Sequence, residues 1–64
     1  MYKVVFYSFL TSKHVVISLH RKLDKAVLKA RKARIDDGYN NVSIIAPDGT
    51  ELDIYGNKIV LAQN

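Results

Sequence analysis

Residues Asp24–Gly38, DKAVLKARKARIDDG, decide the fold, because this stretch combines helical periodicity with signals for both ends of a helix. Asp24 can serve as an N-cap, and Gly38 offers the left-handed conformation that commonly follows the last helical turn. Three alanines recur on one side at helical spacing: Ala26, Ala30 and Ala33. The stretch therefore predicts a helix from Lys25 to about Asp36, with an alanine side that can lie close to a sheet.

Two strands are expected before this helix. Tyr2–Leu10 is rich in valine and aromatic residues, which favour a strand with apolar side chains on both faces. After a polar turn, His14–His20 alternates in a way that predicts a second strand. We expect its helix-facing side chains to be Val15, Ile17 and Leu19, and those of the other face to be His14, Val16, Ser18 and His20.

Two further strands are expected after the helix. Asn41–Ala46 is short and β-branched, Glu51–Tyr55 follows it, and the intervening Pro-Asp-Gly sequence favours a tight turn. Lys58–Leu61 could add a short fifth strand or an arm that reaches another subunit. The order β-β-α-β-β predicts a single α+β domain over residues 1–64, with a small antiparallel sheet and one helix packed on one face.

The composition is that of a small globular domain, with 48% hydrophobic and 25% charged residues. The chain has no cysteine, so disulfides and thiolate metal sites are excluded, and apolar burial must hold the fold. We expect a reducing compartment and a cytoplasmic location. Lys3 interrupts the apolar N-terminal run, which is too short to span a membrane, so no membrane association is expected.

Charge is distributed unevenly along the chain, whose net charge is +4. Residues 36–53 contain five carboxylates and no lysine or arginine, whereas basic residues crowd the predicted helix. The residues expected to contact an acidic protein or nucleic-acid phosphates are Lys22, Lys25, Lys29, Arg31, Lys32 and Arg34. Both kinds of partner are open at this point.

No catalytic or metal-binding pattern stands out. His14 and His20 would lie roughly 20 Å apart along one strand, which is too far to share an ion. The serines have no visible activating base, and no glycine-rich phosphate loop is present. We therefore predict a protein that is not an enzyme and that needs no cofactor or metal.

A single short helix can cover only one face of the predicted sheet, and the other face is also apolar. Its residues are expected to be Val5, Tyr7, Phe9, Val16, Ile45 and Tyr55. Contiguous exposed apolar surface commonly marks an interface, and a two-fold axis covers such a surface with a second copy of itself. These residues therefore predict a homodimer.

The segment Asp24–Gly56, with its Ala-Val-x-x-Ala helix and its Asp48-Gly49-Thr50-Glu51 hairpin, resembles a family of short bacterial and phage proteins. That family is functionally uncharacterised, and the resemblance implies the β-β-α-β-β layout without transferring a site. The leading hypothesis is a small non-enzymatic interaction or regulatory module, homodimeric, with a basic helix facing an acidic partner. The alternative is a small nucleic-acid-binding protein that uses the same helix on phosphates.

Overall fold

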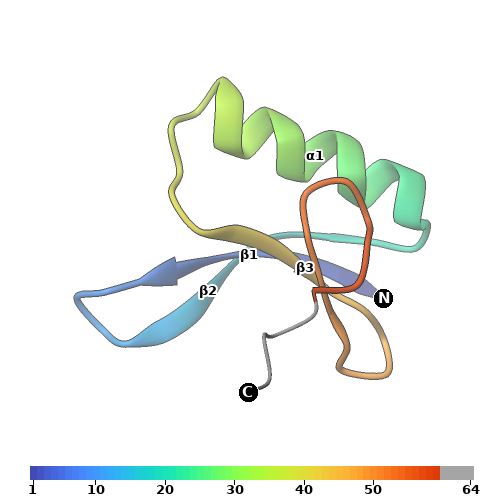
Figure 1. Ribbon diagram of the computed structural model, residues 1–64, viewed down its shortest axis with the longest axis horizontal. Coiled ribbons are helices and arrows are strands. Elements are labelled where there is room, and N and C mark those ends of the chain that lie inside the picture. The colour runs from blue at the N-terminus through green and yellow to red at the C-terminus, as the bar shows by residue number, and fades with distance from the viewer. Residues whose placement is uncertain (60–64) are drawn as a thin grey trace, which may run out of the picture.

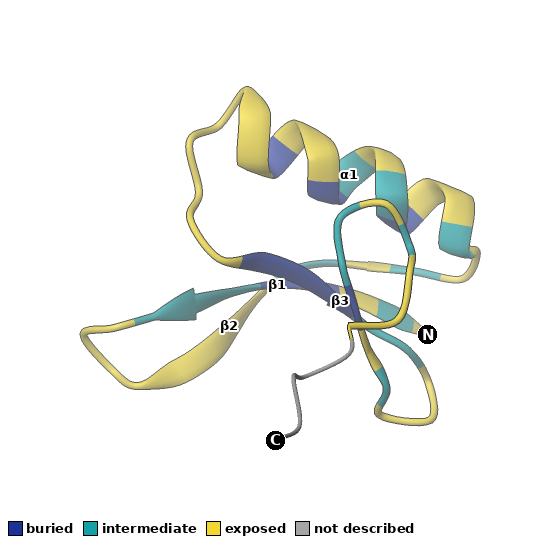
Figure 2. Ribbon diagram, viewed as in Figure 1, coloured by how far each residue is buried: buried dark blue, intermediate teal, exposed yellow. Residues whose placement is uncertain are grey.

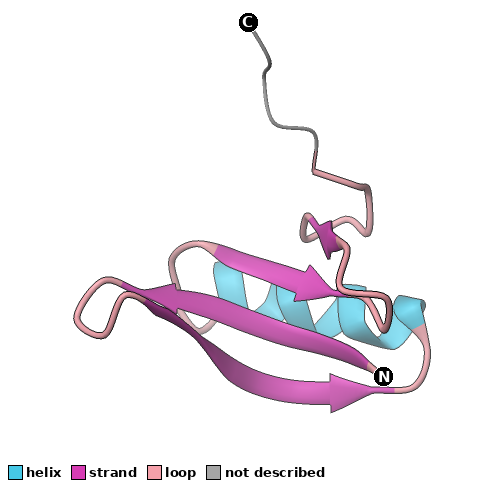
Figure 3. Cartoon of the chain, turned by 90° about the horizontal axis from the view of Figure 1, so that it is seen from below, coloured by secondary structure: helices cyan, strands magenta, loops and turns pink. Residues whose placement is uncertain are grey.

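The computed structural model describes residues 1–59, which form four strands and one helix (Figure 1). In chain order these are β1 (Tyr2–Ser8), β2 (Lys13–His20), α1 (Leu23–Ile35), β3 (Val42–Ile45) and β4 (Glu51–Leu52). The strands form one antiparallel sheet in the order β2-β1-β3-β4, with α1 on one face (Figure 3). The predicted α+β class and the order β-β-α-β-β are confirmed. No helix in this part of the chain has the length and apolar character needed to cross a bilayer.

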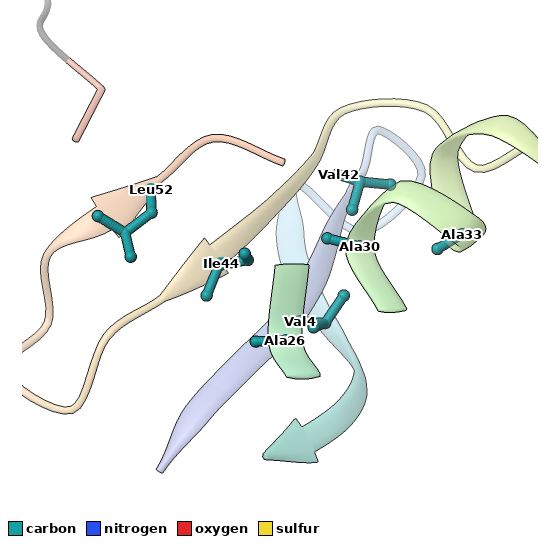
Figure 4. Close-up of a cluster of buried hydrophobic side chains, with 7 residues drawn as sticks. All are labelled: Val4, Ala26, Ala30, Ala33, Val42, Ile44 and Leu52. Atoms are coloured by element: carbon teal, nitrogen blue, oxygen red, sulfur yellow. The ribbon is translucent and has the colours of Figure 1, made fainter. Parts of the chain in front are cut away.

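The core lies between α1 and the central strands (Figures 2 and 4). The three predicted alanines of α1 are all fully buried: Ala26, Ala30 and Ala33. They pack on Val4 of β1 and on Val42 and Ile44 of β3. Because alanine side chains are short, the helix backbone can approach the sheet, and the strands supply the larger side chains. The predicted alanine side of the helix is therefore confirmed.

Gly38 follows the end of α1 as predicted, but the helix starts earlier than predicted. The helix begins at Leu23, two residues before the predicted start, and Lys22 takes the N-cap position without a side-chain cap. The prediction of Asp24 as N-cap is therefore wrong. Asp24 lies within the first turn, where its Oδ1 accepts a hydrogen bond from the Lys25 N–H at 2.9 Å. Its negative charge there interacts favourably with the positive end of the helix dipole. Gly38 adopts the predicted left-handed conformation after the helix, with φ 76°.

A bulge in β2 changes which side chains face the helix. Val4 pairs with Ser18 and Val5 pairs with Val16, so Ile17 is an extra residue between two regular stretches of pairing. Because one extra residue reverses the alternation beyond it, the predicted faces of the last part of β2 are wrong. Leu19 lies on the face away from the helix, whereas Ser18 and His20 lie on the helix side.

The hairpin between β3 and β4 has the predicted tight turn. The Ala46 N–H donates to the Thr50 carbonyl at 2.8 Å, and Gly49 adopts φ 90°. The Thr50 N–H donates to Asp48 Oδ1 at 2.9 Å. This hydrogen bond stabilises the charged form of the Asp48 side chain over the protonated form, and so it holds the pKa of Asp48 below its usual value. The turn thus depends on the local preferences of its own residues.

The chain turns away from the sheet earlier than predicted, because β4 ends at Leu52 rather than at Tyr55. Asp53 Oδ1 accepts from the N–H groups of Tyr55 and Asn57, both at 2.9 Å, and this closes a loop that rises beside α1 (Figure 1). Lys58 then makes a single antiparallel bridge to Leu52. The rest of the predicted fifth strand, Val60 and Leu61, lies outside the described residues.

Candidate functional site

The sheet face that turns away from α1 is the candidate site and is called the open face below. Side chains of paired residues share a face, so the register identifies its members. They are Lys3, Val5 and Tyr7 of β1, His14, Val16 and Leu19 of β2, Ser43 and Ile45 of β3, and Glu51 of β4. Viewed from this side, no described helix lies in front of the strands (Figure 3).

Four residues predicted for a dimer surface are brought together on the open face: Val5, Tyr7, Val16 and Ile45. Val5 is itself buried, Tyr7 and Ile45 are half-buried, and Val16 is 51% exposed. Phe9 lies just beyond β1 in the exposed hairpin turn, where its ring packs edge-on against Tyr7 with 5.2 Å between centroids. The apolar surface therefore continues from the sheet onto the hairpin tip.

The structure places Tyr55 on the other side of the molecule. It lies in the loop beside α1, where the Arg31 guanidinium carbon is 5.5 Å from the centroid of the tyrosine ring. The sequence predicts a strand from Glu51 to Tyr55, and alternation along such a strand would place Tyr55 on the open face. Because Asp53 ends that alternation, Tyr55 packs against the helix and not against the open face.

Sequence reasoning missed Leu19, which belongs to the open face and is 55% exposed. The local pattern does not reveal this position, because Val15, Val16 and Ile17 are consecutive apolar residues and only the pairing with β1 makes Ile17 the bulged one. Leu19 and Val16 are consecutive open-face residues of β2 on either side of that bulge. Because of these two residues, β2 carries the most exposed apolar part of the open face.

Two polar side chains from the opposite marginal strands β2 and β4 approach each other across the open face. His14 Nε2 is 4.0 Å from Glu51 Oε2, and the His14 ring packs edge-on against Tyr7 at 5.4 Å. These side chains border a shallow hollow of about 470 Å³, together with Phe9, Ser43 and Ile59. Charged and polar groups around an apolar centre are the usual arrangement of a protein interface.

Ser43 lies in this hollow but is not placed as a nucleophile. Ser43 is 4% exposed, and its Oγ has no hydrogen-bond partner among the described residues. A serine nucleophile needs an adjacent base within hydrogen-bond reach, and His14 is engaged with Glu51 instead. In residues 1–59, no three histidine or carboxylate side chains gather where they could hold a metal ion.

The basic residues of α1 divide into two groups. At about 100° per residue, one flank of the helix carries Lys25, Lys29 and Lys32, which we call the lysine flank. The opposite flank carries Arg31 and Arg34, and two exposed apolar residues separate the groups along the outer side of the helix: Leu28 and Ile35. Lys22 precedes the first turn. The six predicted contact residues therefore do not form one continuous stripe.

Two of the basic side chains have partners within the chain. Lys32 Nζ is 3.3 Å from Asp37 Oδ1, and Arg31 lies over Tyr55. Both lysine and aspartate are exposed in that pair, and exposed ion pairs contribute little to stability. The Lys32–Asp37 pair can therefore separate at small cost.

Comparison with known proteins adds no relative to this description, since no protein-family model, curated protein or solved structure matches the chain. The resemblance of Asp24–Gly56 to short bacterial and phage proteins stays a prediction.

Proposed function

We propose that this chain is a non-enzymatic interaction module that forms a homodimer through the open face and presents the basic side of α1 to an acidic partner. One observation supports the dimer above all others: the only described helix covers the opposite face of the sheet. Antiparallel sheets that face water normally carry polar residues on that side. Here β2 instead presents Val16 and Leu19, each more than half exposed.

The arrangement of the open face suits contact with a second copy of itself. Tyr7, Val16 and Ile45 lie around the buried Val5. Of the charged residues, Glu51 is on the marginal strand β4, and Lys3 is on β1 between Leu19 and Ile45. A two-fold axis would bury the exposed parts of Val16 and Leu19 in both copies, and the long Lys3 side chain can keep its ammonium group in water. Burial of apolar surface contributes roughly 25 cal/mol per Å², so a modest contact area can offset part of the cost of association.

The second half of the proposal concerns α1, which lies on the other side of the sheet from the proposed dimer contact. Its basic residues would stay accessible when two copies meet through their open faces. Lys25 and Arg34 are exposed on opposite flanks of the helix. A dimer of this kind would therefore present two basic helices, facing away from each other, to acidic partners.

Light scattering on the purified chain across micromolar concentrations tests the dimer. We expect a mass that rises to twice that of one chain, and we expect Tyr7→Lys to shift the equilibrium to the monomer, because it places a charge within the apolar centre. Leu28→Lys is the matched control, since it makes the same kind of change on the exposed side of α1. A wild-type protein that stays monomeric throughout, or equal loss of dimer in both variants, would contradict the proposal.

A further inference from the structure

β2 is an edge strand with an open side. Within residues 1–59 it pairs only with β1, although it is the longest strand of the sheet. An edge of this kind presents backbone N–H and C=O groups that can pair with another extended chain. The bulge at Ile17 interrupts this edge, but the stretch from Lys13 to Val16 on its N-terminal side is regular. We call the outer side of β2 the free edge.

The hydrogen bonds of β1 show which residues of β2 direct their backbone groups outward. The Tyr7 N–H donates to Asn41 on the β3 side, so the backbone groups of its neighbours Phe6 and Ser8 turn toward β2. The β2 partners of those two residues use their backbone groups inside the sheet. The alternate residues, His14 and Val16, therefore direct theirs to the free edge.

The side chains of the same two residues lie on the open face, since His14 is paired with Tyr7 and Val16 with Val5. In an antiparallel pair, residues that exchange hydrogen bonds stand opposite each other and share a face. A strand added to the free edge would thus place its hydrogen-bonding residues on the open face, beside Val16. Its other residues would point to the helix side.

The lysine flank of α1 lies on the β2 side of the molecule. The other flank meets the loop that follows β4, because a Cβ at Gly56 would lie 3.1 Å from Val27 Cγ2, and Arg31 lies over Tyr55. β4 and β2 are at opposite margins of the sheet. Lys25, Lys29 and Lys32 therefore point toward the free edge, and β2 itself has basic residues at both ends, at Lys13 and at Arg21 just beyond it.

We propose that the free edge binds an extended peptide in which apolar and acidic residues alternate, by adding it to the sheet as a fifth strand. The peptide's apolar side chains lie on the open face beside Val16, and its acidic side chains lie on the helix side, toward the lysine flank. This rests on the proposed function, since it specifies where and how the acidic partner of α1 binds.

Two other occupants fit the free edge less well. A second copy of β2 in antiparallel pairing would bring Lys13 of one chain toward Arg21 of the other, so like charges would meet at both ends. A nucleic-acid strand could neutralise the lysines but has no alternating N–H and C=O groups to match the backbone of β2. Both remain outcomes that the following experiment can detect.

The experiment measures binding of labelled synthetic peptides to the full chain by fluorescence anisotropy at low salt. One peptide alternates valine and glutamate over the length of β2, and the other has the same composition with valines and glutamates in separate blocks. We expect the alternating peptide to bind at least about tenfold more tightly, because only it can place all its carboxylates on the helix side. Equal affinity for the two peptides would overturn the proposal.

Backbone methylation of the peptide tests pairing without changing the protein. Methylation of the valine N–H groups should weaken binding about tenfold for each hydrogen bond lost, because these groups face His14 and Val16. Methylation of the glutamate N–H groups, which face away from β2, should leave affinity within about twofold. The reverse order, or no difference, would overturn the proposed strand addition.

A matched pair of variants tests the lysine flank. Lys25→Glu should weaken the alternating peptide severalfold or more, whereas Arg34→Glu, with the same change of charge on the other flank, should have little effect. Equal loss in both would show general attraction to acidic chains, which keeps the proposed function and overturns this inference. A mixed-sequence oligonucleotide that binds more tightly than the alternating peptide would overturn both. Light scattering on the same samples reports the dimer separately.

Discussion

Replacement of Ile44 by alanine should be among the most damaging single changes to this domain. Ile44 is fully buried on the helix side of β3, where it packs against the alanines of α1. It pairs with Leu52 of β4. The change removes three carbon atoms, worth about 2.4 kcal/mol at about 0.8 kcal/mol each. The cavity left behind adds to this, so the expected loss is about 3–4 kcal/mol.

That loss is large for a chain of 64 residues. Domains of this size have unfolding free energies of roughly 3–10 kcal/mol at about 0.05–0.15 kcal/mol per residue, so Ile44→Ala should remove a third of the stability or more. Urea unfolding followed by circular dichroism measures it. The titration should be repeated at several protein concentrations, because association through the open face would add a concentration-dependent contribution.

Ile35→Ala is the matched control, since the same chemical change is made at a residue that is 65% exposed on α1. Its unfolding free energy should stay within about 0.5 kcal/mol of the wild type. A loss below about 1 kcal/mol for Ile44→Ala, or similar losses for the two variants, would refute the placement of the core between the alanine side of α1 and β3.

Three further predictions concern the turns and the open face. Gly56→Ala should destabilise the chain by about 1 kcal/mol more than Gly49→Ala, as measured by urea unfolding, because both glycines have positive φ but only at Gly56 would a Cβ crowd Val27. Ser43→Ala should raise stability by up to about 1 kcal/mol, because it removes a buried hydroxyl that has no partner among the described residues; a loss of stability would show that this hydroxyl is satisfied. NMR titration should give Asp48 a pKa below the usual value of about 3.9, and its contribution to stability should be present above that value and be lost as pH falls through the lowered pKa.

The features that the sequence predicts well are those set by neighbouring residues. The alanine side of α1 follows from helical spacing alone, and the turn after Ala46 follows from the backbone preferences of its proline, aspartate and glycine. Each signal lies within a few residues, so it does not depend on contacts with distant parts of the chain. The order of elements and the α+β class follow from these local signals.

The features that the sequence does not predict depend on contacts between strands. In β2 the apolar residues Val15, Val16 and Ile17 are consecutive, so the local pattern cannot say which of them is extra. Only pairing with β1 makes Ile17 the bulged residue, and that choice moves Leu19 to the open face. The early end of β4 has a similar cause, since the side chain of Asp53 competes with strand pairing for the following N–H groups.

The same geometry explains how much of the candidate site was predictable. Val5 and Tyr7 lie on a regular strand, and alternation alone places them on the open face. Tyr55 was assigned by alternation along a strand that ends before it, and so its position could not be predicted. Helical spacing alone predicts that the basic residues divide between two flanks of α1. Which strand lies beneath each flank can be predicted only when the strand order is known.

The two proposed contacts are physically linked, because they share part of one surface. Val16 lies on the open face, and its backbone groups face the free edge. A peptide added beside it would place its own apolar side chains on the open face and would enlarge the surface that two copies can bury. Binding at the edge should therefore strengthen self-association, and by thermodynamic reciprocity the dimer should bind the peptide more tightly than the monomer does. If Tyr7→Lys abolished the dimer and left peptide affinity unchanged, the two surfaces would act independently.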